Sequence, residues 1–197
     1  MFELLRALSA GALDFATAFV FAATWWRPEW LGRAWVKTLM LTMLIEFLVV
    51  HSFGFLFAAT NEGGAKSIAM LLGFGAFYLL FAGVFAAAFK TWWPVWMFAW
   101  LIGSKLWALV TGTVEPEAQR NYVMAVWIAS TLAYLLGCFL TVVLPLPRLG
   151  VSGPASRYGV DPSATGLWLE QPHRVLAFGT MYFFVVGCAR VAFAPLD

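Results

Sequence analysis

The sequence predicts an all-α integral membrane protein, a polytopic helical bundle with about six transmembrane helices. Two bulk properties support this fold class: hydrophobic residues make up 62% of the 197-residue chain, and charged residues only 11%. Soluble domains average about 45–50% and about 25% for the same two groups. So few charged side chains could not cover the surface of a water-soluble protein of this size. The third observation is that the apolar residues fall into six runs long enough to cross a bilayer.

The first three runs are bounded by residues that interrupt a helix or prefer water. The run 8–26 is followed by Arg-Pro-Glu, where proline cannot donate the next backbone hydrogen bond. The run 38–60 ends at Asn-Glu-Gly-Gly, a composition typical of turns. The run 67–89 contains no charged residue and is the clearest of the six. Each run is close to the roughly 20 helical residues that about 30 Å of hydrocarbon requires.

The last three runs complete the set of predicted spans. The run 95–112 starts after Trp-Trp-Pro, the run 122–145 ends at a proline, and the run 175–194 lies close to the end of the sequence. Most connections are short, so we expect sequential helices to be antiparallel neighbours. The whole chain, 1–197, is therefore predicted to form a single transmembrane domain.

One connection, 146–174, is much longer than the others and is rich in proline and glycine. Within it, Asp161-Pro162 is typical of a helix start, with Asp as the N-cap and Pro at the first helical position. We expect 164–170 to form an amphipathic helix that lies on the membrane surface, with Leu167 and Trp168 inserted into the bilayer.

Lys and Arg residues are distributed unevenly between the two predicted sides of the membrane. An even number of spans places both termini on one side. The basic residues on that side are Arg6, Lys66, Arg120 and Arg190, and those on the opposite side are Arg27, Arg33, Lys37, Lys90, Arg148, Arg157 and Arg174. Cytoplasmic loops carry the excess of Lys and Arg. We therefore expect a location in a bacterial inner membrane, with both termini outside.

Four ionisable residues lie well inside the predicted spans: Asp14, Glu46, His51 and Lys105. Ionisable side chains inside a membrane are costly, so each is a candidate for a functional role. At about 1.5 Å per residue, all four fall between roughly 12 and 20 Å from the same side. We expect them to form one belt near the midplane, in which Lys105 pairs with Asp14 or Glu46.

A second group of polar residues precedes the last span: Glu170, His173 and Arg174. The spacing Glu170-x-x-His173 matches one ligand pair of a di-iron bundle, but no second pair exists and a proline interrupts this one. We therefore expect no metal site. These residues are assigned to capping of the last helix and to contact with lipid headgroups.

Haem is the other cofactor to consider, because the chain has two histidines. His51 lies about 20 Å deeper than His173, whereas the two axial ligands of one haem lie at nearly the same height. We predict no cofactor. A net charge of +2 without a basic cluster excludes nucleic-acid binding. No nucleophile, P-loop or dinucleotide motif predicts a catalytic residue, so we do not expect an enzyme.

Glycines within the spans indicate where helices approach one another closely. Gly179 and Gly187 share a face of the last span. Other small residues predicted to serve the same purpose are Gly73, Gly75, Gly83 and Gly103.

Two functions remain open from the sequence. The first is a small transporter or channel that moves protons, ions or a small polar solute past the belt of Asp14, Glu46, His51 and Lys105. The second is a structural or accessory subunit of a larger membrane complex, in which the belt only fixes the helix packing. The expected partners are the lipid bilayer and either further copies of this chain or other membrane subunits.

Overall fold

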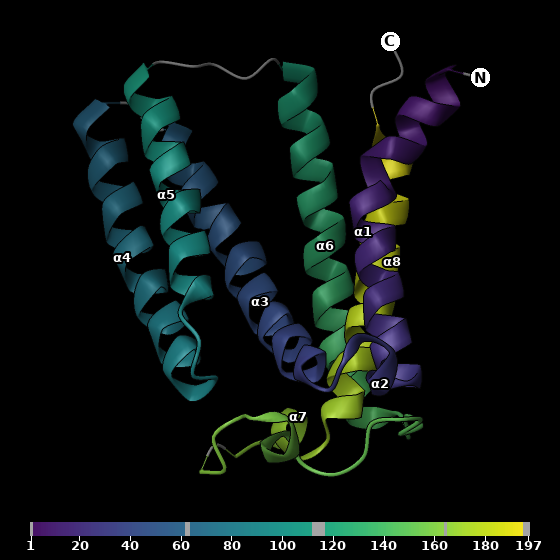
Figure 1. The fold of residues 1–197 in the computed structure, drawn as a ribbon. Coiled ribbons are helices and arrows are strands. Elements are labelled where there is room, and N and C mark those ends of the chain that lie inside the picture. Colours follow the sequence, from purple (N-terminus) through teal and green to yellow (C-terminus); the bar gives the residue numbers. More distant parts are fainter. Residues whose placement is uncertain (1, 62–63, 112–116, 164, 195–197) are drawn as a thin grey trace. The chain divides into compact units, whose positions relative to one another are not determined.

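The computed structural model describes residues 2–61, 64–111, 117–163 and 165–194 of the chain, and these form helices without any strand. The elements in chain order are α1 (Phe2–Trp26), α2 (Pro28–Leu31), α3 (Ala34–Asn61), α4 (Gly64–Ala88), α5 (Trp93–Thr111), α6 (Glu117–Val143), the 3₁₀ helix η1 (Ala155–Tyr158), α7 (Leu167–Glu170) and α8 (Pro172–Phe193) (Figure 1). The predicted all-α class is confirmed. Each predicted span coincides with one long helix, to within a turn or two at the ends. Gly112 of the fourth predicted span and Ala164 of the predicted surface helix lie outside the described residues.

Within the described ranges, four helices are long and apolar enough to cross a membrane. They contain the segments Ala34–Phe55, Ala65–Ala88, Gln119–Val143 and Pro172–Phe193. Helices α1 and α5 have 25 and 19 residues. Their crossing of the membrane stays a prediction.

The chain divides into two compact units. Unit 1 consists of Met1–Met43 and Pro116–Asp197, and unit 2 of Leu44–Glu115. Helix α3 therefore contributes its first part to unit 1 and the remainder to unit 2. In unit 1, α8 packs against both α1 and α6, and α1 and α8 lie side by side (Figure 1).

Glycines allow α1 and α8 to approach closely in an antiparallel arrangement. A Cβ atom on Gly11 would lie 2.6 Å from the carbonyl oxygen of Gly187, and a Cβ atom on Gly179 would overlap the ring of Phe21. Phe21 is completely buried and also contacts Phe183, with ring centroids 5.5 Å apart. The predicted packing role of Gly179 and Gly187 is therefore confirmed.

In unit 2, α4 and α5 pack against each other as antiparallel neighbours, as the short connection between them predicts. A Cβ atom on Gly75 would lie 2.9 Å from Cδ1 of Ile102, so this glycine also serves close packing. The same prediction is wrong for three other glycines. Among the described residues, nothing lies within 4 Å of a Cβ atom built on Gly73, Gly83 or Gly103.

Candidate functional site

Asp14 forms an ion pair inside unit 1. Its Oδ2 atom on α1 lies 2.8 Å from Nε of Arg190 on α8, with the Asp14 side chain 14% exposed and that of Arg190 40% exposed. The antiparallel packing of α1 on α8 brings the two residues to the same level. The sequence predicts a partnership between Lys105 and either Asp14 or Glu46, and places Arg190 only as a charge near a span end. The structure instead gives Asp14 the partner Arg190, because helices α1 and α8 are neighbours.

The other three residues of the predicted belt all belong to unit 2. Glu46 and His51 lie on α3, and Lys105 lies on α5. Glu46 and Lys105 are partly buried, whereas His51 is exposed. Among the described residues, no side chain forms an ion pair with Lys105. The belt thus divides into one paired acid in unit 1 and three polar residues in unit 2.

His51 lies within a group of aromatic rings, which we call the His51 cluster: Phe47, His51, Phe55 and Tyr78. The Phe47 ring stacks on the imidazole at a centroid distance of 5.4 Å, and Phe55 meets it edge-on at 6.0 Å. Tyr78 of α4 meets it edge-on at 6.3 Å. Phe47 and Phe55 stand one turn before and one turn after His51, so the three share a face of α3. Since Phe47 is 40% and Phe55 43% exposed, the cluster forms an aromatic surface around one imidazole.

The aromatic contacts continue from α4 to α5, and they show which level along α5 lies next to His51. The rings of Tyr78 and Phe98 are 6.0 Å apart. Lys105 follows Phe98 by seven residues, or about 10 Å along the helix. His51 is therefore closer in height to Phe98 than to Lys105.

Arg174, at the start of α8, caps the C-terminal end of α6. Its Nη1 atom donates hydrogen bonds to the carbonyl oxygens of Thr141 and Leu144, the latter at 3.2 Å. Its Nε atom donates to Oε1 of Gln171 at 2.6 Å, which fixes the side chain. The last carbonyls of a helix have no partner within it and carry partial negative charge, so a guanidinium stabilises them. The sequence did not predict this contact within the protein, and the expected headgroup contact by Arg174 stays a prediction.

Two residues near Arg174, His173 and Trp168, also contact other parts of the protein, which the sequence did not predict. His173 is only 4% exposed and contacts the backbone of Leu146, so it does not face the headgroups. Trp168 packs on Phe178 with ring centroids 5.5 Å apart, and its Nε1 lies 3.4 Å from Oγ1 of Thr141. The indole therefore packs on other residues of unit 1, and its expected insertion into lipid stays a prediction. Of these loop residues, Glu170 remains exposed.

The predicted helix start at Asp161-Pro162 is also wrong. The Asp161 carboxylate accepts hydrogen bonds from the amide and the hydroxyl of Ser163, at 2.9 and 2.7 Å. This is the pattern of an Asx turn, which ends within two residues instead of starting a helix. The helix that follows, α7, has only four residues.

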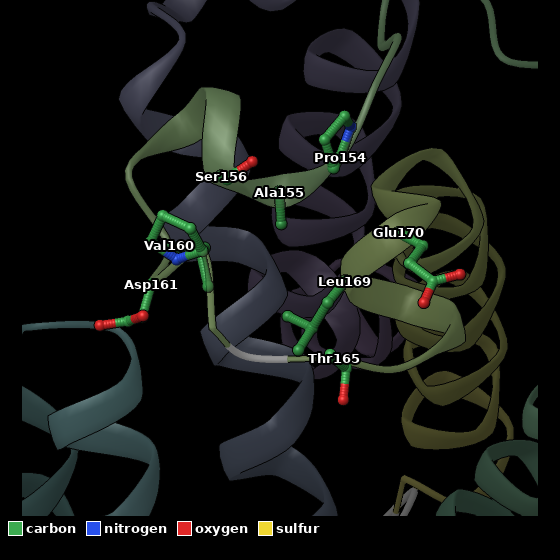
Figure 2. Close-up of a pocket in the computed structure, with 9 residues that line it drawn as sticks. Pro154, Ala155, Ser156, Val160, Asp161, Thr165, Leu169 and Glu170 are labelled. Carbon is green, nitrogen blue, oxygen red and sulfur yellow. The ribbon is translucent and has the colours of Figure 1, made fainter.

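A small pocket lies between η1 and α7, with a volume of about 230 Å³. Its lining includes two carboxylates, those of Asp161 and Glu170. Figure 2 shows that these two side chains point to opposite sides of the pocket, away from each other. The Asp161 carboxylate is bound by Ser163. The two acids therefore do not converge on a common ligand position.

Removing the cap on α6 is expected to loosen the long connection. Arg174→Met leaves the carbonyls of Thr141 and Leu144 without their donor, which costs about 1–3 kcal/mol for groups bonded to a charge. Hydrogen exchange of the amides in the last turn of α6 should become faster, and proteolysis within 144–171 should increase. Arg157→Met, an exposed residue of the same connection, is the matched control and should change neither. Equal behaviour of the two variants would contradict the capping role.

No protein-family description, no curated protein and no solved structure matches the chain. Its class therefore follows from the fold alone. The four apolar helices indicate an integral membrane protein. The site residues predicted from the sequence fall into three groups within the described ranges: Asp14 in the ion pair of unit 1, three residues of unit 2, and those at the end of the long connection.

Proposed function

We propose that the chain is an accessory subunit that binds another membrane protein through the His51 cluster. The observation that carries this proposal is the exposure of His51 on a helix whose segment Ala34–Phe55 is apolar enough to cross a membrane. His51 lies about 25 Å along α3 from Ala34 and about 15 Å from Asn61, well away from either end.

A polar imidazole exposed to lipid is unfavourable, because lipid tails offer no hydrogen-bond partner for its nitrogen atoms. Stacking on Phe47 covers one face of the ring but does not satisfy the nitrogens at its edge. A neighbouring protein can supply an acceptor such as a carboxylate or a backbone carbonyl. The exposed rings of Phe47 and Phe55 then provide the apolar contact area around that hydrogen bond.

The direct pairing of Asp14 with Arg190 supports the same function. A carboxylate held by a guanidinium at 2.8 Å stabilises the packing of α1 on α8. The Asp14 carboxylate is therefore less available to exchange a proton or to bind a cation. This pair supports the structural role that the accessory hypothesis assigns to ionisable residues inside the helices.

Transport is the second candidate function, and the residues of unit 2 favour it. Glu46 and Lys105 are ionisable residues that are only partly buried on helices α3 and α5. Lys105 has no ion-pair partner among the described residues. Its ammonium group could therefore attract a mobile anion, or its charge could change the affinity of Glu46 for a proton. A transport path would then use Glu46, His51 and Lys105 without Asp14.

A site-specific photocrosslink tests the accessory function in native membranes. A photoreactive amino acid at position 55, next to His51, is expected to give one discrete adduct with a different membrane protein. The same probe at position 107 of α5, where Trp107 is 72% exposed, is the control for random collisions and should give none. His51→Leu should abolish the adduct, and this variant is expected to insert and fold because leucine is favourable in lipid.

Two outcomes would contradict the accessory function. The first is an adduct with a second copy of this chain, which would indicate a homo-oligomer. The second is proton or cation flux by the purified chain in liposomes that Glu46→Gln abolishes while the helical circular dichroism stays unchanged. That result would establish transport.

A further inference from the structure

We call the segment 27–33, between the end of α1 and the start of α3, the corner. The long connection 146–174 of unit 1 forms hydrogen bonds to the end of α1, next to the corner. The Nε1 atom of Trp25 donates to the carbonyl of Pro147 at 3.0 Å, and the amide of Gly150 donates to the carbonyl of Trp25 at 3.1 Å. A Cβ atom on Gly150 would lie 2.5 Å from the carbonyl oxygen of Trp26, so the two backbones are in direct contact. The segment that follows Trp26 is thus held in place before any ligand binds.

Arg27 stands on this corner and stacks on Trp30. Its guanidinium carbon lies 5.5 Å from the centre of the Trp30 ring. Such a cation–π contact holds the guanidinium plane in position, and the Arg27 side chain is exposed. The other arginine of the corner, Arg33, is engaged differently, because it forms an exposed ion pair with Glu29 at 3.6 Å.

The position of the corner relative to the membrane follows from its neighbours in the chain. The apolar segment of α3 begins at Ala34, directly after the corner. Trp26 is 58% exposed, Trp30 63% and Trp35 43%. Exposed indoles at the end of a span are typical of the headgroup region, where the ring contacts acyl chains and the polar edge contacts water.

We propose that Arg27, with the exposed rings of Trp26 and Trp30, forms a binding site for the phosphodiester group of an anionic phospholipid. A guanidinium binds phosphate oxygens through two parallel hydrogen bonds, and the indoles cover the glycerol and the first acyl carbons. Basic side chains outnumber acidic ones on this end of unit 1, which attracts a lipid of net negative charge. Besides Arg27, the basic residues of the segments 27–37 and 146–174 are Arg33, Lys37, Arg148, Arg157 and Arg174, and the acidic ones are Glu29, Asp161 and Glu170.

Native mass spectrometry of the full chain in detergent micelles tests this site directly. Phosphatidylglycerol is titrated into the sample, and phosphatidylcholine is titrated as the zwitterionic reference. We expect tighter binding of phosphatidylglycerol, and Arg27→Gln should weaken that binding about fivefold, the loss expected for one charge-assisted bidentate contact. Arg33→Gln removes the same charge from the same corner and is the matched control, with an expected change below about twofold.

Two further measurements separate this site from simpler explanations. Arg27→Lys keeps the charge but loses the planar stacking group. Its affinity for phosphatidylglycerol should therefore lie between those of the wild type and Arg27→Gln. Glycerol phosphate without acyl chains should not compete, because the indoles contribute only when acyl carbons are present. Equal losses for Arg27→Gln and Arg33→Gln, equal binding of both lipids, or competition by free glycerol phosphate would each overturn the proposal.

Discussion

Asp14→Leu is expected to lower the free energy of unfolding by about 2–4 kcal/mol. Breaking a buried ion pair on one side costs about 3–5 kcal/mol, because the remaining charge keeps its desolvation penalty without its partner. A smaller loss is expected for this pair because the Arg190 side chain is 40% exposed and partly solvated. The measurement is titration with sodium dodecyl sulfate in mixed micelles, followed by helical circular dichroism.

The double variant Asp14→Leu/Arg190→Leu distinguishes this ion pair from a simple packing defect. It removes both charges, so most of the lost stability should return. Glu29→Gln breaks the exposed pair with Arg33, where the side chains are 60% and 73% exposed, and should have almost no effect. A neutral effect of Asp14→Leu alone would show that the pair does not stabilise the packing of α1 on α8.

Gly179→Ala is expected to destabilise unit 1 by about 1–3 kcal/mol, the usual range for overpacking. The new methyl group would overlap the ring of Phe21, which is completely buried and cannot move into solvent. The two helices must then separate, and the same unfolding titration reports the loss.

Gly83→Ala is the matched control for this substitution. Gly83 also lies within an apolar helix, but no described atom lies within 4 Å of the position that its new methyl group would take. Replacing it should leave stability unchanged or raise it by roughly 0.5–1 kcal/mol, since glycine within a helix is unfavourable. Combining Gly179→Ala with Phe21→Leu should restore part of the lost stability, because leucine is smaller and leaves space for the methyl group of Ala at position 179. Equal effects at positions 179 and 83 would argue against close packing at Gly179.

The positions of the long helices could be predicted from the sequence, because each depends on local information. The length of an apolar run and the turn residues beside it are both visible without a structure. The run 67–89, for example, corresponds to Gly64–Ala88, which begins three residues earlier and ends one residue earlier. Which helices touch is not local information, and the predictions that depended on it were confirmed only in part.

Asp14 and the glycines of α4 illustrate this limit. The sequence predicts that Asp14 needs a basic partner, but finding Arg190 requires knowing that α1 packs on α8. Likewise, the spacing of Gly73, Gly75 and Gly83 marks small residues along one helix without saying which of them a neighbour covers. Only Gly75 is covered, by Ile102 of α5.

The contacts of the long connection within the protein were not predicted, for a different physical reason. An indole and a guanidinium both suit the headgroup region, so the sequence favours a membrane-facing position for Trp168 and Arg174. The structure gives both side chains partners within the protein: Phe178 for the indole and the α6 carbonyls for the guanidinium. A single sequence carries no signal for such partners, since they lie some 10 to 30 residues away.

The pairing of α1 with α8 also sets the order of events during synthesis. Asp14 leaves the ribosome 176 residues before Arg190 (190 minus 14), which at about 5–20 residues per second is a wait of roughly 10–35 s. Throughout this interval the first helix carries an acid without its counter-charge. A nascent chain that stops before α8 therefore keeps Asp14 without its Arg190 partner, and only the chain that contains α8 forms the pair.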